Sequence, residues 1–186
     1  MKTLLRTILL SAVVCQQAYA AASKMPVATN CSTVLPAAVN ELLTSQFPKW
    51  RPKRLSDLES YDQKLWLKSH PENCPGIAEG HYQSGDDLSY AVLLVPKLTP
   101  TNGYQLIVLN KKTTQPTYVW KLLDASEGQH NSGAVVSTVK PGKYSDLERA
   151  KSVTTMSDAI DFEWLEQAAV LYYWSSGRYL KLQISD

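Results

Sequence analysis

The stretch AAVLYYWSSGRYLKLQIS, residues 168–185, carries the clearest structural pattern in the chain. Two runs rich in aliphatic and aromatic residues flank Ser176-Gly177, a pair that suits a two-residue turn with glycine at positive φ. The pattern predicts a β-hairpin whose strands are residues 168–174 and 178–184, with Ser175 opposite Arg178. Because side chains alternate along a strand, this register also assigns the two faces of the hairpin.

One face of the predicted hairpin is apolar and is expected in the core. The other face is aromatic and polar, with Trp174 opposite Tyr179 and Tyr172 opposite Lys181. Tyrosine and tryptophan are enriched where proteins bind other macromolecules. The candidate binding residues are therefore Tyr172, Trp174, Tyr179 and Lys181. The alternative is that this face packs beneath the N-terminal helices, which would bury the same rings.

The centre of the chain has the composition of β-strands. Residues 90–95 and 104–109 are runs dominated by Val, Leu and Ile that are apolar on both faces, which is typical of strands covered on both sides. Residues 117–123 and 134–139 predict two further strands, and residues 151–164 predict one or two short ones.

The N-terminal third predicts helices. A first helix is expected to begin near Pro36, to carry an apolar stripe that ends with Phe47, and to stop at Pro48. A second is expected over residues 56–68, with Ser56 and Glu59 forming a capping box. The pattern predicts an α+β fold, with one antiparallel-dominated sheet of about five to seven strands and one or two N-terminal helices packed on it.

Residues 1–20 have the features of a secretory signal peptide. Lys2 and Arg6 precede an uncharged apolar run, and Ala18-Tyr19-Ala20 is a small-residue cleavage pattern. The apolar run is far shorter than the roughly 20 residues of a membrane-spanning helix. We therefore expect cleavage after about Ala20, a flexible leader over residues 21–33, and a single α+β domain over residues 34–186. The product is expected to be periplasmic or secreted, without a membrane span.

The charge balance argues against nucleic acid as a partner. The 19 basic residues include Lys2 and Arg6, so the mature chain holds 17 basic and 17 acidic side chains. A neutral chain has no long-range field that would attract nucleic acid or an anionic membrane. The basic cluster at residues 49–54 is interrupted by proline and tryptophan, and we expect it to be a solvated loop.

Cys31 and Cys74 are the two cysteines that remain after cleavage. In an oxidising compartment they are expected to form a disulfide. Such a bond would close a long loop and would fix the N-terminal segment to the start of the sheet region.

Residues 80–94, GHYQSGDDLSYAVLL, lead from a polar turn into an apolar strand. The segment resembles an FG-GAP-like calcium loop, the G-D-F-x-G-D-G-x-x-D-Y-A pattern of integrin-type and secreted bacterial proteins. In that pattern acidic side chains and a carbonyl surround the ion, since calcium takes six to eight oxygen ligands. Here His81 and Ser89 stand where two of the acids would be, and Asp86 and Asp87 are adjacent and point apart. We therefore expect a degenerate turn that keeps the shape without the ion.

The whole chain also resembles a broad set of uncharacterised exported bacterial proteins. They share an F-P-x-W motif at the end of an N-terminal helix, here residues 47–50, and a turn of the type just described. They also share a C-terminus of the type Y-Y-W-x-x-G-x-Y-x-K-x-x-x-S-D, here residues 172–186. The resemblance implies export and this fold, and it transfers no activity.

Motifs for catalysis or metal binding are absent from the sequence. His70, His81 and His130 have none of the spacings of zinc sites, and no G-x-S-x-G elbow occurs. A triad of His130, Asp124 and a serine would have to be assembled from distant segments. The acidic stretch over residues 158–166 is expected to be a solvated edge rather than a glycosidase pair. We therefore expect no cofactor and no metal site.

Together these features favour an exported, non-catalytic binding protein. Its partner would be an envelope protein or another macromolecule, and an inhibitor or immunity-type protein is one form of this hypothesis. One alternative is an envelope hydrolase with an unrecognised active site, in which His81 or His130 would share a pocket with a carboxylate or hydroxyl. The other alternative is a structural accessory protein of the cell envelope.

Overall fold

The computed structural model describes residues 31, 34–83, 85, 87–111 and 117–185. The expected signal peptide, and the expected leader except for Cys31, lie outside these residues. The described residues form two α-helices, the 3-10 helix η2 and eleven strands. Their bounds are α1 (Ala37–Gln46), β1 (Trp50–Pro52), η2 (Leu55–Asp57), α2 (Ser60–Ser69), β2 (Ile77–Gly80), β3 (Ser89–Pro96), β4 (Asn102–Lys111), β5 (Tyr118–His130), β6 (Ala134–Val139), β7 (Lys143–Ser145), β8 (Ser152–Thr154), β9 (Ala159–Trp164), β10 (Ala168–Ser175) and β11 (Arg178–Ser185).

The strands form three antiparallel sheets rather than the single sheet of five to seven strands that we expected. Sheet A has the order β1-β3-β4-β5, with β2 also paired to β3, and sheet B has the order β11-β10-β9-β6. Strands β7 and β8 form a separate hairpin. The α+β class is confirmed, but the strand count and the number of sheets were wrong. Local alternation predicts a strand, whereas the sheet that it joins depends on long-range pairing.

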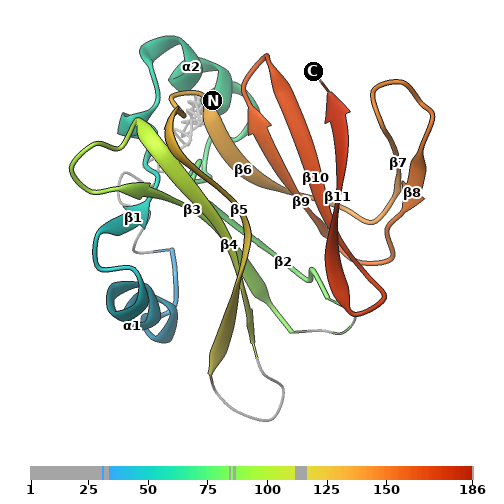
Figure 1. The fold of residues 1–186 in the computed structure, drawn as a ribbon, viewed down its shortest axis with the longest axis horizontal. Coiled ribbons are helices and arrows are strands. Elements are labelled where there is room, and N and C mark those ends of the chain that lie inside the picture. Colours follow the sequence, from blue (N-terminus) through green and yellow to red (C-terminus); the bar gives the residue numbers. More distant parts are fainter. Residues whose placement is uncertain (1–30, 32–33, 84, 86, 112–116, 186) are drawn as a thin grey trace, which may run out of the picture.

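Sheets A and B pack face to face as a sandwich (Figure 1). Inward side chains of β3 and β4, such as Leu93 and Leu106, contact Val136, Ile160 and Phe162 of sheet B. The runs at residues 90–95 and 104–109 are apolar on both faces because sheet A is covered twice. Its inner face meets sheet B, and its outer face meets α1.

Helix α1 covers the outer face of sheet A as its apolar stripe predicted. Val39 and Leu43 are buried against Val92, Leu94 and Ile107. The helix ends where expected, because Phe47 leaves the helical conformation ahead of Pro48. Cys31 and Cys74 lie at bonding distance beside this layer, with their Cα atoms 5.6 Å apart, which agrees with the expected disulfide.

Helix α2 begins later than expected. Residues 55–57 form η2, and the carboxylate of Asp57 accepts the backbone N–H of Arg54 at 2.7 Å. The predicted capping box of Ser56 and Glu59 was therefore wrong. Asp57 instead caps the short helix η2. Trp66 of α2 packs on Leu58 and Val135 at one end of the sandwich.

The two long sides of the sandwich differ. On one side β2 and β6 are joined, because Val136 N–H donates to the carbonyl of Pro75 at 2.8 Å and the Thr138 hydroxyl donates to that of Glu79 at 2.8 Å. On the other side the edge strands β5 and β11 have no ladder between them. We call this side, where among the described residues side chains but no backbone ladder connect the two sheets, the open side, and β5 is the longest strand that borders it.

Candidate functional site

The C-terminal hairpin has the predicted register, with Tyr172 opposite Lys181 and Trp174 opposite Tyr179. Ser176 and Gly177 both have positive φ, as a two-residue turn requires. The aromatic face does not lie beneath the helices, because it packs against sheet A instead. Tyr172 is only 3 % exposed, and its hydroxyl donates to Asp124 Oδ2 of β5 at 2.8 Å. Tyr172 therefore contributes to the core between the sheets.

The other three candidate binding residues lie nearer the surface. Trp174 and Tyr179 are half-buried and form an edge-to-face pair with ring centroids 5.0 Å apart. The Tyr179 hydroxyl donates to Asn110 Oδ1 of β4 at 2.8 Å, and burial raises the pKa of this phenol above its usual value. Lys181 is exposed. The candidate residues thus border the open side of the sandwich.

Strand β5 forms the edge of sheet A on this open side. Among the described residues, it pairs with β4 alone. Its side chains Val119, Trp120 and Leu122 are exposed although all three are large and apolar. Proteins usually protect such an edge, because its free backbone groups can pair with another chain. The predicted strand at residues 117–123 was confirmed from Tyr118 onward. Strand β5 is longer than predicted, because it continues through polar residues to His130.

An apolar groove flanks β5 on the outer face of sheet A. Trp120 and Leu122 form one wall, and the turn after α1 forms the other, with Phe47 packed edge to face on Trp120 at 5.0 Å between ring centroids. The groove has a volume of about 370 Å³. Its lining also includes Pro48 and Trp50, so that the F-P-x-W motif borders it. We call this the outer groove.

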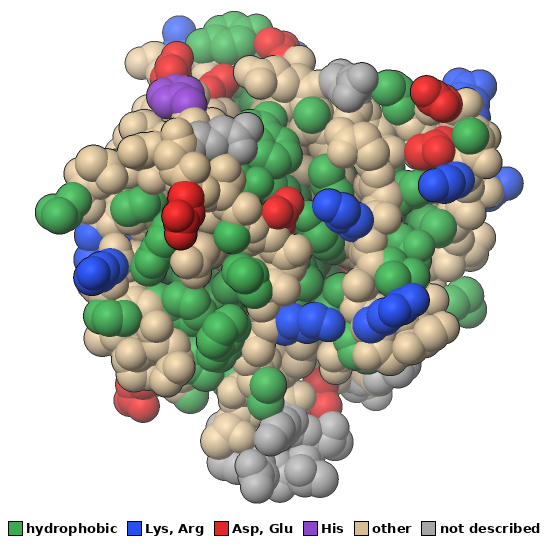
Figure 2. Space-filling model, viewed as in Figure 1, with side chains coloured by type: hydrophobic (Ala, Val, Ile, Leu, Met, Phe, Trp, Pro, Cys, Tyr) green, Lys and Arg blue, Asp and Glu red, His purple; other side chains and the backbone are tan. Residues whose placement is uncertain are grey.

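A smaller, basic hollow flanks β5 on the opposite face. Its volume is about 130 Å³, and its two charged lining residues are Lys121 of β5 and Lys181 of β11. The rest of its lining is apolar or aromatic and comes from Leu122, Leu123, Tyr172, Tyr179 and Leu180. We call this the inner groove, and we call β5 residues 118–123 with both grooves the edge site. In Figure 2, hydrophobic side chains gather between α1 and strands β4 and β5, and Lys or Arg side chains lie to the right of them.

Sequence reasoning missed Val119, Trp120 and Leu122 as surface residues. An apolar run such as residues 117–123 is typical of a covered strand, and only the number of strands in each sheet shows that β5 is an edge. Lys121 was the available signal, because a lysine within an apolar strand is a common protection of an exposed edge.

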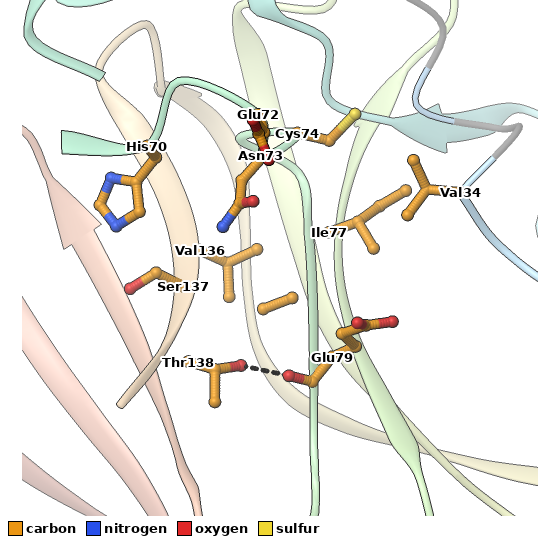
Figure 3. Close-up of a pocket in the computed structure, with 11 residues that line it drawn as sticks. Val34, His70, Glu72, Asn73, Cys74, Ile77, Glu79, Val136, Ser137 and Thr138 are labelled. Atoms are coloured by element: carbon orange, nitrogen blue, oxygen red, sulfur yellow. Dashed lines mark hydrogen bonds between the residues drawn. The ribbon is translucent and has the colours of Figure 1, made fainter. Parts of the chain in front are cut away.

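A third pocket lies where β2 meets β6 (Figure 3). It has a volume of about 180 Å³ and is lined by His70, Glu72, Ser137 and Thr138 among others. His70 stacks on Trp66 with ring centroids 4.1 Å apart, and burial lowers the pKa of its imidazole. The hydroxyl of Thr138 donates to the Glu79 carbonyl and so helps to hold β2 and β6 together, whereas Nδ1 of His70 is buried without a hydrogen-bond partner among the described residues.

His81 shares a shallow pocket of about 260 Å³ with Ser157 and Asp158. These three residue types occur in hydrolase active sites, but here the side chains of Ser157 and Asp158 are hydrogen-bonded to the backbone rather than to His81's imidazole. Asp158 Oδ2 accepts the backbone N–H of His81 at 3.0 Å, and the Ser157 hydroxyl donates to the carbonyl of Tyr82 at 3.0 Å. Asp86, which the FG-GAP-like turn also includes, lies outside the described residues.

The remaining acidic candidates are not brought together. Asp161 lies on β9, where burial, together with Glu163, raises the pKa of its carboxyl to about 6. Glu166 accepts a hydrogen bond from the Tyr61 hydroxyl at 2.9 Å, and Asp124 is bonded to Tyr172 rather than to a histidine. The side chain of His130 lies 3.9 Å from Glu59.

No protein-family model, curated protein or solved structure matches the chain. Both grooves of the edge site are lined by the exposed Leu122 of β5, and the outer groove adds the exposed Trp120.

Proposed function

We propose that this chain is an exported, non-catalytic protein that binds another protein of the cell envelope through the edge site. The observation that carries the proposal is strand β5, an edge among the described residues, which exposes Trp120 and Leu122 beside an apolar groove and Val119 on its other face. Contiguous exposed apolar surface of this kind marks interaction sites in soluble proteins. An inhibitor or immunity-type protein is the form of binding protein that the expected export favours.

The anchors of such an interface would be Trp120 and Leu122. Burying a side chain of this size contributes roughly 1.5–3 kcal/mol, and a few aromatic anchors dominate most interfaces. Phe47 holds the Trp120 ring from one side, so little side-chain freedom remains to be lost on binding. The rim contributes Lys49, Lys121 and Lys181, which can orient a partner.

One finding supports the expected location. Cys31 and Cys74 are in position for a disulfide, which is favoured outside the cytoplasm. In the described part of the chain, no helix has the length and apolar character needed to span a membrane.

The test compares two leucines of similar exposure. Leu122 in the edge site is 46 % exposed, and Leu147 in the β7–β8 hairpin is 51 % exposed. Cells would express the wild type, Leu122→Gln or Leu147→Gln, and the cross-linked envelope complexes would be purified and identified. We expect a discrete partner with the wild type and with Leu147→Gln, and its loss with Leu122→Gln. Equal recovery with both variants, or no partner at all, would count against the proposal.

An envelope hydrolase is the second candidate, because His81, Ser157 and Asp158 line one pocket. If that pocket were the functional one, His81→Ala would abolish the cellular function while Leu122→Gln would leave it intact. The edge-site proposal gives the opposite pair of results.

A further inference from the structure

Resting on the proposed function, we propose that the partner supplies an extended segment that pairs with β5 as an added strand of sheet A. We further propose that this segment alternates apolar and acidic side chains. The inference names the class of ligand and its mode of binding, neither of which follows from an exposed patch alone.

The backbone of β5 provides the first argument. An edge strand directs the N–H and C=O groups of alternate residues away from its neighbour. In the part of the chain that the structure describes, β5 pairs with β4 alone, so residues 118–123 offer these groups on the open side of sheet A. Peptides that add a strand to a sheet gain affinity from such main-chain hydrogen bonds and specificity from pockets for alternate side chains.

The two grooves provide the second argument, because they lie on opposite faces of the same strand. Successive side chains of an added strand point to opposite faces of the sheet. One set would therefore enter the outer groove beside Trp120 and Leu122, and the other would face Lys121 and Lys181. An apolar set matches the first surface, and an acidic set matches the second.

The charges on the inner side provide the third argument. Lys121 and Lys181 are exposed, and no described carboxylate lies within 4.0 Å of either ammonium group. The nearest acid along β5 is Asp124, which already accepts the hydroxyl of Tyr172. An acidic segment would supply the missing counter-charge.

A second copy of this chain fits the same surface poorly. Antiparallel pairing of two β5 strands about a twofold axis joins the two inner faces. Both copies of Lys121 would then lie on one face, together with both copies of Lys181, without an acidic partner. Like charges across strands are destabilising, so an acidic segment from another protein is the better occupant.

The experiment uses three synthetic heptapeptides with the purified protein. EVELEVE alternates acidic and apolar residues, KVKLKVK carries the opposite charge, and EEVLVEE keeps the composition of the first without its alternation. Binding is followed by titration, and hydrogen exchange of the β5 amides is measured with and without each peptide. We expect EVELEVE to bind at least about ten-fold more tightly than the other two and to slow exchange at alternate amides of residues 118–123.

Charge reversal provides the matched control. Both lysines are exposed, so Lys121→Glu combined with Lys181→Glu should leave the fold intact and transfer the preference to KVKLKVK. Binding without slower exchange at β5, or without any charge preference, would overturn the inference. If the β5 amides become more protected as protein concentration rises, without any peptide, a second copy of the chain covers the edge. That result would also overturn the inference.

The outcome can be separated from that of the proposed function. If Leu122→Gln abolishes partner capture in cells while none of the peptides binds, strand addition is wrong and the binding function stands. If partner capture is also unaffected, both proposals fail.

Discussion

At the scale of single residues, Lys53 departs most clearly from what its sequence context suggested. The basic cluster at residues 49–54 was expected to be solvated, yet the side chain of Lys53 is fully buried. Its ammonium group donates to the backbone carbonyls of Asn131 and Ser132. In the same cluster, Arg51 forms a bidentate salt bridge with Asp57. The expectation was wrong because acceptors 78 and 79 residues away bind Lys53, which no local pattern reveals.

Lys53 predicts a pH dependence of stability. Burial lowers its pKa to about 7, against the raising effect of Asp57 and Asp62. The folded chain therefore holds this proton less tightly than the unfolded chain, and the free energy of unfolding rises with pH between about 7 and 10. We expect a slope of up to about 1.4 kcal/mol per pH unit for the wild type relative to Lys53→Met, measured by urea denaturation from pH 7 to pH 9.5. Parallel profiles would show that the lysine keeps its ordinary pKa.

Asp161 predicts the opposite pH dependence, a free energy of unfolding that falls as pH rises. One of its carboxylate oxygens is buried without a hydrogen-bond partner, and burial raises its pKa to about 6. A carboxyl with a raised pKa destabilises the fold once it ionises, so the penalty is present at pH 7 and absent near pH 4. Asp161→Asn should therefore be more stable than the wild type at pH 7, by about 1–2 kcal/mol, and equally stable near pH 4.

The control for Asp161 is Glu148→Gln, which changes an exposed acid in the β7–β8 hairpin. Thermal denaturation at both pH values should show no change for this variant. A stabilisation by Glu148→Gln as large as that by Asp161→Asn would point to net charge rather than burial as the cause.

At the scale of elements, the Cys31–Cys74 pair fixes the segment before α1 to the segment before β2. The two cysteines are 43 residues apart in sequence, a loop for which chain entropy predicts a stabilisation of about 4 kcal/mol. We expect the double variant Cys31→Ala, Cys74→Ala to lose about 3–4 kcal/mol of unfolding free energy in urea. Thiol alkylation of the unfolded, unreduced wild type should add no mass, and labelling of both cysteines would show that no bond forms.

Elements set by neighbouring residues could be predicted from the sequence, and elements set by distant ones could not. The hairpin of β10 and β11 has the predicted register because Ser176-Gly177 fixes it locally. The end of α1 follows from Pro48. Strand β1, in contrast, consists of Trp50, Arg51 and Pro52, a sequence that does not predict a strand. It forms because these residues pair with β3.

At the scale of the whole molecule, the candidate site follows from the difference between the two sides of the sandwich. The join of β2 to β6 closes one side, whereas β5 and β11 leave the other open. The sequence pointed to Tyr172, Trp174, Tyr179 and Lys181, which border that open side from sheet B. The exposed apolar residues Trp120 and Leu122 of β5, which line the outer face of sheet A, could be recognised only once the order of strands was known.

The most direct test of the account is site-resolved hydrogen exchange of the purified protein alone. If β5 is an uncovered edge, alternate amides of residues 118–123 exchange much faster than those of β4, which pairs on both sides. Protection of every β5 amide to the level of β4, at protein concentrations where the chain is monomeric, would show that the edge is covered and would contradict the proposed binding surface.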